Sequence, residues 1–226
     1  MKATEILSHY TQFPVLLNIL EYKKIVLGNP ENWDDKTDKN IVEYEKNKYE
    51  KKTIRALCLT EFTELGYDNI LHWKIYAAGK SGCRIDFDKE MLEEVVKSHK
   101  AEIGKVKYLN SEALKKKPKN LPKNPLFLKR NSYSAENEWR IVWIDKENKK
   151  FELNISKYFK KGIIKCIRLS PDLPEDLAKK LCSFLKKKYK IKFVHSWILQ
   201  NPNWEREARK IFNLSSTEVR HEKNNP

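Results

Sequence analysis

No hydrophobic run in this sequence approaches the roughly 20 residues that a membrane-spanning helix needs. The N-terminal stretch MKATEILSHY lacks the apolar core of a secretory signal peptide. Glycine is scarce, with 6 among 226 residues, whereas hydrophobic residues reach 40%. These features favour a folded chain without a leader or a membrane span. We expect one domain over residues 1–212 and a polar C-terminal tail over residues 213–226.

Closely spaced cysteines are also lacking. The four cysteines, Cys58, Cys83, Cys166 and Cys182, are far apart, and each lies among apolar residues. They show neither a Cys-x-x-Cys motif nor the Cys/His spacing of a zinc site. Because a free cysteine behaves as a small hydrophobic residue, we expect buried thiols in a protein of the reducing cytoplasm.

Arginine is rare beside lysine, although the chain has a net charge of +15 and a pI of about 9.5. A surface of that charge attracts polyanions, of which nucleic acid is the commonest. Lysine, however, lacks the bidentate fork with which arginine binds bases and phosphates. The charge therefore permits two interpretations, a nucleic-acid-binding surface or a general lysine bias of the proteome.

Hydrophobic periodicity predicts strands interspersed with helices. Strands are expected at residues 8–13, 25–27, 54–62, 83–87, 105–110, 138–144, 150–155, 163–170 and 191–199, and helices at residues 14–25, 68–82, 89–102 and 174–189. The charged segment 35–52 is a helix or a loop, and the Lys/Pro/Asn-rich segment 114–125 is a linker. We therefore predict an α+β fold with a mixed, mostly antiparallel sheet and flanking helices.

Two segments carry more detailed predictions. Residues 150–155 follow a Lys/Asn turn, which predicts a hairpin with residues 138–144. The helix at residues 174–189 begins at a proline and ends in lysines, as the helix dipole favours. Its expected buried stripe consists of Leu177, Leu181, Phe184 and Leu185.

Three features have the residue types of a reactive site. His9 lies in the stretch SHYT, close to the N-terminus. Trp73 and Tyr76 share one face of the helix HWKIY, and Glu138 opens the apolar strand EWRIVWI. Each feature also has an ordinary explanation, because histidines at strand edges are often structural and aromatic residues three apart are often core. Glu138 has lysines and Arg140 near it to pair with.

A cluster of acids near the first turn permits further alternatives. Asp34, Asp35 and Asp38 are close enough in sequence to bind a metal ion, which would suit a nuclease. They are equally consistent with a solvated loop.

The order of several motifs resembles the bacterial domain-of-unknown-function family 2971. ILHWKIYAAGKSGCRIDF matches that family's "lMW-HYA--HKG-CIGF" pattern, and EWRI matches its "EYR-i" pattern. SHYT fits its opening strand, and LGNPENWDD fits its "FNDP" motif loosely. Ile75 and Lys80 stand where the family has histidines. The matches extend from about residue 6 to residue 200.

A more distant resemblance is to ADP-ribosyltransferases of the His-Tyr-Glu type, whose glutamate-bearing strand is similar to NEWRIVWID. The resemblance implies an ADP-ribosyltransferase-like fold that uses NAD as its substrate and needs no metal. His9 and Thr11 would then orient the NAD ribose, with the histidine as a donor. Tyr76 or Trp73 would stack on the nicotinamide. Glu138 would face the nicotinamide ribose, and Arg140 on the same strand is a further expected NAD-binding residue.

That chemistry explains why an apolar strand begins with a glutamate. Breaking the nicotinamide–ribose bond builds positive charge on the ribose carbon, and a nearby carboxylate stabilises the charge. The resemblance also implies that the segment before this strand contacts the acceptor. The expected acceptor-binding or nucleic-acid-binding residues are Lys115, Lys116, Lys117, Lys119, Lys123, Lys129 and Arg130.

The first hypothesis is therefore an NAD-dependent ADP-ribosyltransferase-like bacterial effector, a toxin or antiphage defence protein that modifies nucleic acid or protein. The alternative is a non-catalytic basic module that binds nucleic acid or a partner protein in a defence system. A nuclease based on the acidic cluster is a third hypothesis. The partners expected are a nucleic acid or ribonucleoprotein acceptor and a neutralising or defence-system protein, with no membrane.

Overall fold

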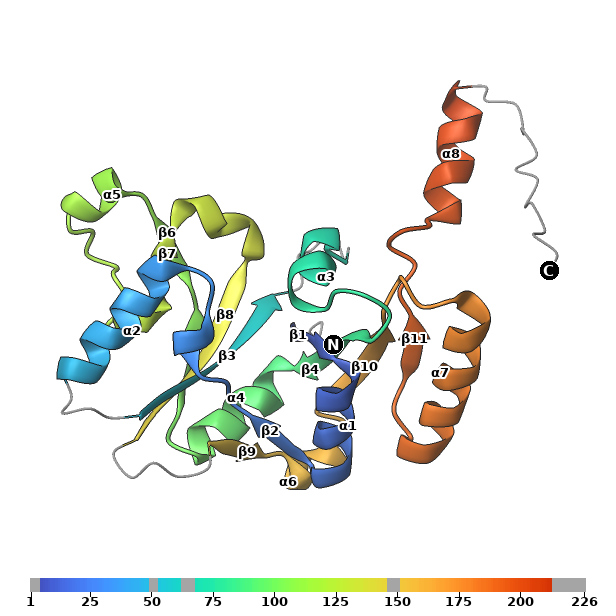
Figure 1. Ribbon diagram of the computed structural model, residues 1–226, viewed down its shortest axis with the longest axis horizontal. Helices are drawn as coiled ribbons and strands as arrows, with labels where there is room; N and C mark the ends of the chain where they lie inside the picture. The colour runs from blue at the N-terminus through green and yellow to red at the C-terminus, as the bar shows by residue number, and fades with distance from the viewer. Residues whose placement is uncertain (1–4, 49–52, 62–67, 146–150, 213–226) are drawn as a thin grey trace.

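The computed structural model describes residues 5–48, 53–61, 68–145 and 151–212. The polar tail expected at residues 213–226 and the turn expected before residue 151 lie outside these ranges. Within them, a seven-stranded sheet carries helices on both faces (Figure 1). The expected α+β class is confirmed.

The elements follow the expected order closely. The strands are β1 (Ile6–Gln12), β2 (Lys24–Val26), β3 (Thr53–Glu61), β4 (Gly82–Asp88), β5 (Glu102–Lys105), β6 (Lys107–Leu109), β7 (Leu128–Arg130), β8 (Glu138–Asp145), β9 (Glu152–Asn154), β10 (Ile164–Leu169) and β11 (Phe193–His195). The helices are α1 (Phe13–Tyr22), α2 (Lys36–Lys48), α3 (Ile70–Tyr76), α4 (Lys89–Ser98), α5 (Ser111–Lys115), α6 (Ser156–Phe159), α7 (Glu175–Tyr189) and α8 (Pro202–Phe212), with the 3-10 turns η1 (Pro30–Asn32), η2 (Pro125–Phe127) and η3 (Asn131–Glu136).

The main sheet has the strand order β11-β10-β4-β1-β3-β8-β5. Its neighbouring strands are antiparallel except for β10 and β11, which are parallel. The prediction of a mixed, mostly antiparallel sheet is therefore confirmed.

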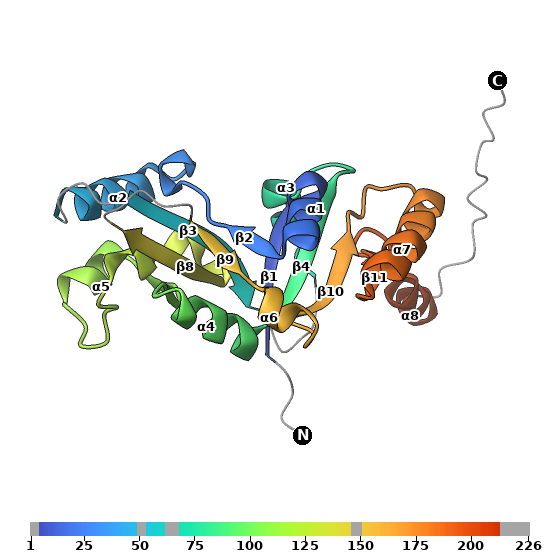
Figure 2. The same ribbon diagram turned by 90° about the horizontal axis from the view of Figure 1, so that it is seen from below.

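The sheet divides between β1 and β3. These strands pair only at Leu7 with Glu61 and at Ser8 with Thr60, whereas β1 pairs with β4 along its whole length and β3 pairs with β8 over most of its own. We call β11-β10-β4-β1 the β4 half-sheet and β3-β8-β5 the β8 half-sheet. Figure 2 shows β3 and β8 running at an angle to β1 and β4. A gap therefore opens between the half-sheets beyond Ser8.

The two faces of the sheet differ in character. One face packs apolar side chains of β1, β3, β4, β8 and β10 against α1, α4 and the small β2-β9 sheet, forming the main core. The opposite face carries smaller apolar clusters under α2 and α3. Between these clusters it buries charged residues, notably Arg84 and Arg140. The face that carries α2 and α3 is therefore the one on which a polar site can form.

Three details differ from the expectations. β9 pairs with β2 rather than with β8, because β3 and β5 already occupy both edges of β8. Leu177 and Phe184 of α7 are 47% and 63% exposed, because α7 packs against the narrow β11 edge through Ala178 and through Leu185, which was expected to be buried. Of the cysteines, only Cys83 and Cys166 are fully buried.

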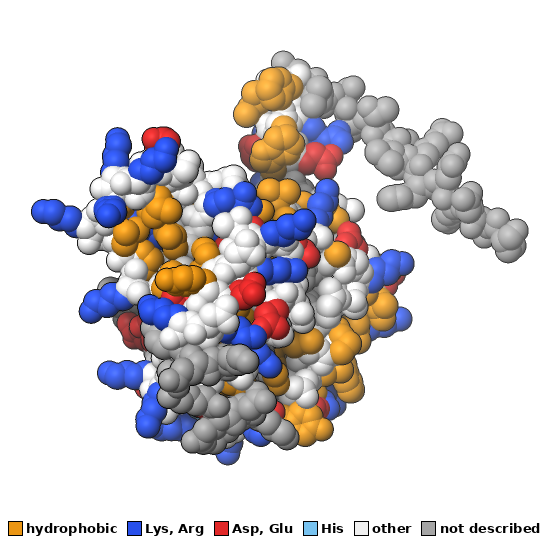
Figure 3. Space-filling model, turned by 60° about the vertical axis from the view of Figure 1, so that its left-hand side comes forward, with side chains coloured by type: hydrophobic (Ala, Val, Ile, Leu, Met, Phe, Trp, Pro, Cys, Tyr) orange, Lys and Arg blue, Asp and Glu red, His pale blue; other side chains and the backbone are white. Residues whose placement is uncertain are grey.

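The last described helix, α8, was not expected from the sequence. It projects from the body of the molecule and carries exposed hydrophobic side chains (Figures 1 and 3). Trp204, Ile211 and Phe212 are the largest of these. Among the described residues, no helix is both long enough and apolar enough to cross a bilayer.

Candidate active site

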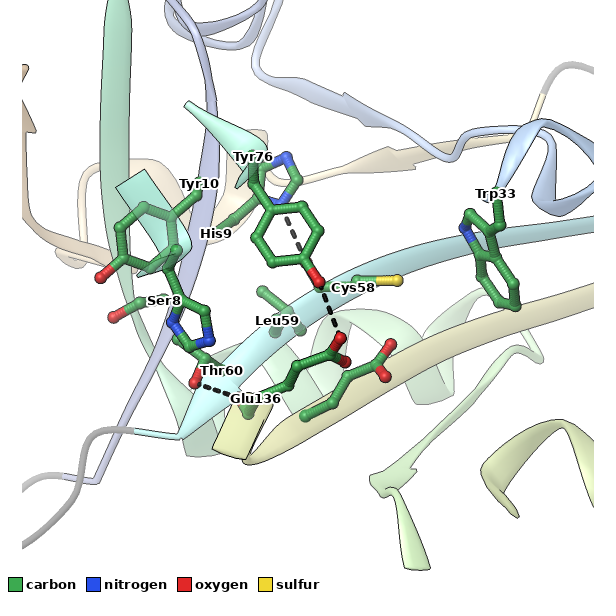
Figure 4. A pocket seen from close by; sticks show the side chains of 11 residues that line it. Ser8, His9, Tyr10, Trp33, Cys58, Leu59, Thr60, Tyr76 and Glu136 are labelled. Carbon is green, nitrogen blue, oxygen red and sulfur yellow. Dashed lines mark hydrogen bonds between the residues drawn. The ribbon is translucent and has the colours of Figure 1, made fainter. Parts of the chain in front are cut away.

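A cavity of about 170 Å³ lies where β1 and β3 separate (Figure 4). Its lining comes from both half-sheets, from α3 and from the turns η1 and η3. The lining residues are Ser8, His9, Tyr10, Trp33, Cys58, Leu59, Thr60, His72, Tyr76, Glu136 and Glu138. The split in the sheet thus brings His9, Tyr76 and Glu138 to one cavity, although 129 positions separate the first from the last.

Helix α3 is held over the cavity by close packing. Trp73 is 2% exposed and meets the Tyr10 ring edge-on, with the centroids 5.3 Å apart. At the end of α3, a Cβ on Gly82 would lie 1.9 Å from the Ala77 carbonyl oxygen, so only glycine permits this approach of helix and strand. Tyr76 is left on the cavity side of α3, 43% exposed.

Glu138 is gripped by a buried arginine. The Nε of Arg140 donates to Oε1 at 2.7 Å and its Nη2 donates to Oε2 at 3.0 Å. Arg140 also donates to Asp38 Oδ2 at 2.6 Å and to the Leu126 carbonyl at 2.7 Å. Glu138, Arg140 and Asp38 are each at most 4% exposed. Such bidentate, charge-assisted bonds fix the orientation of the carboxylate.

A second acid and a lysine complete this cluster. Lys129 Nζ lies 2.6 Å from Glu136 Oε2 and 3.3 Å from Glu138 Oε2. Glu136 also accepts a 3.0 Å hydrogen bond from the Tyr76 hydroxyl. With Asp38 and Arg140, the cluster holds three carboxyl groups against two cations, so one negative charge is in excess when all three acids are ionised.

The pKa values of the two glutamates are shifted in opposite directions. Burial alone would raise the pKa of Glu138, but the charge and hydrogen bonds of Arg140, aided by Lys129, outweigh it and hold that pKa below its ordinary value. For Glu136 burial prevails over its bond to Lys129, and the pKa is raised. The cavity wall therefore offers one carboxylate that stays ionised and a second that is a better proton acceptor.

Backbone geometry explains why both glutamates reach the cavity. Asn137, between them, adopts a left-handed conformation with φ of 44°, which asparagine tolerates better than most residues. Its Nδ2 donates to the Glu61 carbonyl at 3.0 Å, and Thr60 Oγ1 donates to the Glu136 carbonyl at 2.9 Å. These bonds tie the turn before β8 to the end of β3.

His9 bridges the gap between the half-sheets. Its Nδ1 lies 2.9 Å from the Cys58 carbonyl oxygen. Because a carbonyl only accepts, Nδ1 carries the proton, and burial lowers the pKa of the ring so that it is neutral near pH 7. With Nδ1 donating to the Cys58 carbonyl, Nε2 of the neutral ring holds a lone pair and is an acceptor, rather than the donor that we expected. His9 can only accept from a ligand hydroxyl.

His72, one helical turn before Tyr76, is a second buried imidazole on the cavity wall. It is 4% exposed, and its Nδ1 has no hydrogen-bond partner among the described residues. Its ring lies 5.2 Å from Tyr10 and 5.9 Å from Tyr76. Burial lowers its pKa as well.

Other predicted residues lie away from the cavity. Thr11 and Trp73 are not among its lining residues, and Trp73 packs in the small core beneath α3. Arg140 lies behind Glu138, over the Trp33 ring at 4.5 Å, rather than on the cavity surface.

The basic segment divides in two. Lys115, Lys116, Lys117, Lys119 and Lys123 are exposed on α5 and the segment after it, and none lines the cavity. Arg130 is exposed and pairs with Asp35 at 3.1 Å. The Lys129 side chain, by contrast, is only 8% exposed, because the carboxylates of Glu136 and Glu138 hold it inside. Lys129 thus lies inside the acidic cluster rather than on the exposed surface where an acceptor was expected to bind.

The acidic cluster is only partly a solvated loop, because Asp34 is exposed in a bend before α2 whereas Asp38 is buried. Asp38 is buried in α2 against Arg140, and Asp35 accepts from the Thr37 amide and from Arg130. Within the described ranges, no group of three or more His, Cys, Asp or Glu side chains is arranged to hold a metal ion.

Sequence reasoning missed Glu136, His72 and Trp33. For two of them a signal was present. Glu136 stands two residues before Glu138 in ENE, and His72 stands four before Tyr76, which places it on the same helix face. Nothing in the sequence pointed to Trp33, which reaches the cavity only through the packing of α2 and η1.

Comparison with known proteins gives a partial match. The family model described as "Protein of unknown function (DUF2971)" matches residues 72–141, which carry α3, β4 and the start of β8. The expected resemblance to this family is confirmed over that part of the chain. No curated protein matches the chain.

Two solved structures are similar to it, both of DarT from Thermus sp. 2.9. One is in complex with NAD+ (9% identity, 86% of this chain and 96% of that chain covered), the other in complex with ADP-ribosylated ssDNA (11% identity, 87% and 98% covered). The TM-score is 0.37 in both cases. A likeness of this level supports no conclusion about activity, which must come from the cavity itself.

Proposed function

We propose that this protein is an NAD-dependent ADP-ribosyltransferase-like enzyme whose reaction takes place in the cavity between the half-sheets. One observation carries the proposal. Glu138 is kept ionised by Arg140 on the wall of a cavity that also presents a neutral His9 and the ring of Tyr76. A fixed carboxylate in a largely buried site stabilises a positive charge that develops beside it.

The cavity suits one end of NAD rather than the whole molecule. Its 170 Å³ is below the ~300–1,000 Å³ of pockets that enclose a drug-sized ligand. It can take the nicotinamide ring and its ribose, with the rest of the dinucleotide outside. The excess negative charge of the cluster matches the positive charge of the oxidised nicotinamide ring. The exposed Tyr76 ring offers a stacking surface for it.

A ligand hydroxyl can displace the weakest of the donors to the Glu138 carboxylate. Its two oxygens offer about four acceptor positions, of which Arg140 and Lys129 occupy three. The remaining donor is the Cys58 thiol. A thiol is a weak donor, so a ribose hydroxyl that replaces it forms a stronger bond. That bond strengthens further as the ribose becomes cationic.

The reaction then runs as a substitution at the ribose C1′. The bond from C1′ to the nicotinamide nitrogen breaks, and neutral nicotinamide leaves with the bonding electron pair. The acceptor nucleophile forms a bond to C1′ and loses its proton. Glu136, whose pKa is raised by burial, is the group on the cavity wall suited to receive that proton. His9 accepts a hydrogen bond from a ribose hydroxyl and so orients the sugar.

The acceptor that we infer is a nucleic acid or a protein. The net charge of +15 favours an anionic acceptor. The exposed lysines of α5 and the segment after it, Lys115, Lys116, Lys117, Lys119 and Lys123, remain candidates for contacting it. An effector role in toxicity or phage defence is part of this proposal and rests on the same chemistry.

Incubation with NAD labelled in its adenylate half, in the presence of nucleic acid or cell lysate, tests the activity. We expect label transfer or nicotinamide release by the wild type and its loss in Glu138→Gln. Glu45→Gln is the matched control, because Glu45 is equally buried but lies outside the cavity. No nicotinamide release by any variant, together with steeply salt-dependent nucleic-acid binding, would instead support the non-catalytic basic module.

A further inference from the structure

A second cavity, of about 580 Å³, lies on the same face of the sheet at the β4 half-sheet. Its walls come from β4 and β10, from the segment after β11 and from the start of α8. The lining residues are Asp68, Arg84, Arg168, Ser196, Trp197, Ile198, Gln200, Asn201, Pro202 and Asn203. The proposed reaction uses none of them.

The charges of this cavity are nearly balanced. Arg84 is saturated by acids, with two bonds to Asp86 of 2.6 and 3.0 Å and one to Asp68 of 2.7 Å. Arg168 is only loosely paired, 3.6 Å from Asp86 Oδ2, and its Nε makes no hydrogen bond within the described part of the chain. Balanced charge argues against a polyphosphate site. It favours an uncharged ring beside one anionic group, which Arg168 would contact.

The neutral side chains have the types that recognise such a ring. Trp197 is 46% exposed, and the His195 ring supports it edge-on at 5.2 Å. Gln200, Asn201 and Asn203, which carry amide side chains, also line the cavity. Asn201 uses its Oδ1 to accept from the Trp204 amide, which leaves its NH2 group as a donor. Amide side chains pair with base edges, and an aromatic plane stacks on the face of a base.

We infer that this cavity binds an unpaired nucleotide. Its base stacks on Trp197, the amides read the base edge, and Arg168 holds the adjoining phosphate. A paired base would not fit, because the duplex keeps both faces of the base stacked. The net charge of +15 makes a nucleotide within a single strand the favoured source over a free mononucleotide, since each further phosphate adds attraction.

The strand order gives this site a distinct position relative to the first cavity. Arg168 is on β10 and Glu138 on β8, with β4, β1 and β3 between them. Four strand spacings, one of them the widened spacing between β1 and β3, separate the two residues across the sheet. Tyr10 lines the first cavity and donates a 2.7 Å hydrogen bond to Asp68, which lines the second. A base in the second cavity is therefore an anchor for a strand and not the reacting base.

Nucleotide binding itself does not depend on the proposed transferase activity; only the role of anchoring an acceptor rests on it. Fluorescence anisotropy with a labelled single strand of about 12 nucleotides measures the binding. The same sequence as a duplex and unlabelled AMP as a competitor form the other arms. Trp197→Ala and Arg168→Ala are the test variants, and Trp197→Phe keeps part of the stacking plane.

Two residues supply matched controls. Trp204 is a more exposed tryptophan on α8, and Arg206 is an exposed arginine on the same helix; neither lines the cavity. We expect Trp197→Ala to weaken single-strand binding about 5- to 150-fold, with Trp197→Phe in between. Arg168→Ala should lower the slope of log affinity against log salt by about 1. Trp204→Ala and Arg206→Ala should bind like the wild type.

The outcomes separate cleanly. Single-strand binding much tighter than duplex binding would support a nucleotide within a single strand as the ligand of this cavity. Full competition by AMP, with an affinity equal to that of the strand, would instead make a free nucleotide the ligand. Wild-type affinity in Trp197→Ala and Arg168→Ala, with both folded by circular dichroism, would overturn the inference, and so would the absence of any binding. Nicotinamide release by the same variants, compared with Glu138→Gln, reports on the first cavity separately.

Discussion

Each half-sheet buries an ion pair between an arginine and a carboxylate, but the surroundings of the two pairs differ. Each has an arginine that is at most 2% exposed and that grips, with two hydrogen bonds, an acid two residues away on its own strand. In the β4 half-sheet the pair is Arg84 and Asp86, and in the β8 half-sheet it is Arg140 and Glu138. A second acid joins each pair, Asp68 in the first and Asp38 in the second.

The difference lies in the space beside the acid. Asp86 lines neither cavity, and its Oδ1 also accepts a 2.8 Å bond from Ser8. Glu138 borders the opening at the split, next to His9 and Tyr76. The same ion pair thus holds strands together in one half-sheet and fixes a buried carboxylate on a cavity wall in the other. Proximity to the split, rather than the pair itself, makes the acid a candidate for catalysis.

Removal of either arginine should cause the largest loss in the free energy of unfolding. Arg84→Met and Arg140→Met each remove the main cation of two acids, at least one of them buried, which costs roughly 3–5 kcal/mol for a buried pair. We expect a loss of that size in the free energy of unfolding for both variants, measured by urea denaturation. Only Arg140→Met should also abolish nicotinamide release. Equal stability of Arg140→Met and the wild type would show that the β8 half-sheet does not depend on its pair.

Substitution of the acids separates stability from activity. Glu138→Gln should reduce nicotinamide release about 10²–10³-fold, the loss typical of removing one preorganised electrostatic contact. Asp86→Asn should leave the rate per folded molecule unchanged while lowering stability. Steady-state kinetics at matched folded concentration measures both. Similar rates for Glu138→Gln and Asp86→Asn would remove the distinction between the half-sheets.

The pH dependence of stability should have opposite signs for the two cavity glutamates. The pKa of Glu138 is below its ordinary 4.5 in the folded protein, so its ionised form contributes stability that is present above that value and lost as the pH falls through the lowered pKa. The pKa of Glu136 is raised, so its contribution is present below the ordinary value and lost as the pH rises through the raised one.

Urea denaturation of Glu138→Gln and Glu136→Gln between pH 3 and pH 7 tests these signs. The stability deficit of Glu138→Gln relative to the wild type should be constant at neutral pH and should shrink below about pH 4.5. Glu136→Gln should become more stable relative to the wild type as the pH rises. Parallel curves for the two variants would contradict the assignment of one ionised and one protonatable carboxyl group.

The smallest effect is expected from Tyr76→Phe. This change removes the hydrogen bond to Glu136 but keeps the ring that would stack on nicotinamide. The affinity for NAD should change by no more than the 0.5–1.5 kcal/mol, roughly, of one ordinary hydrogen bond. Tyr76→Ala should weaken NAD binding considerably more. Calorimetric titration compares the two, and equal losses would argue against stacking.

The sequence predicted the parts of this site better than their arrangement. Strand and helix periodicity placed His9, Tyr76 and Glu138 on the correct elements, and the motif order suggested that they meet. The inward position of Lys129 could not be predicted, because it depends on ion pairs with Glu136 and Glu138, and the turn at Asn137 brings these two acids to the same place. The choice between Tyr76 and Trp73 depended on which face of α3 meets Tyr10, and spacing alone leaves that open.

Long-range pairing was the other limit. The partner of β9 is decided by which strand edges remain free, and the split between β1 and β3 by a register of only two pairs. Neither leaves a local trace in the sequence. The exposed side of α7, with Leu177 and Phe184, likewise depends on the narrow edge strand against which it packs.

A crystal structure of the protein with an NAD analogue that resists cleavage tests the central claim most directly. We predict the nicotinamide inside the cavity at the split, against the Tyr76 ring. A ribose hydroxyl should lie within hydrogen-bonding distance of the Glu138 carboxylate, and a second one near His9 Nε2. An analogue bound at another surface at saturating concentration, with this cavity empty, would contradict the account.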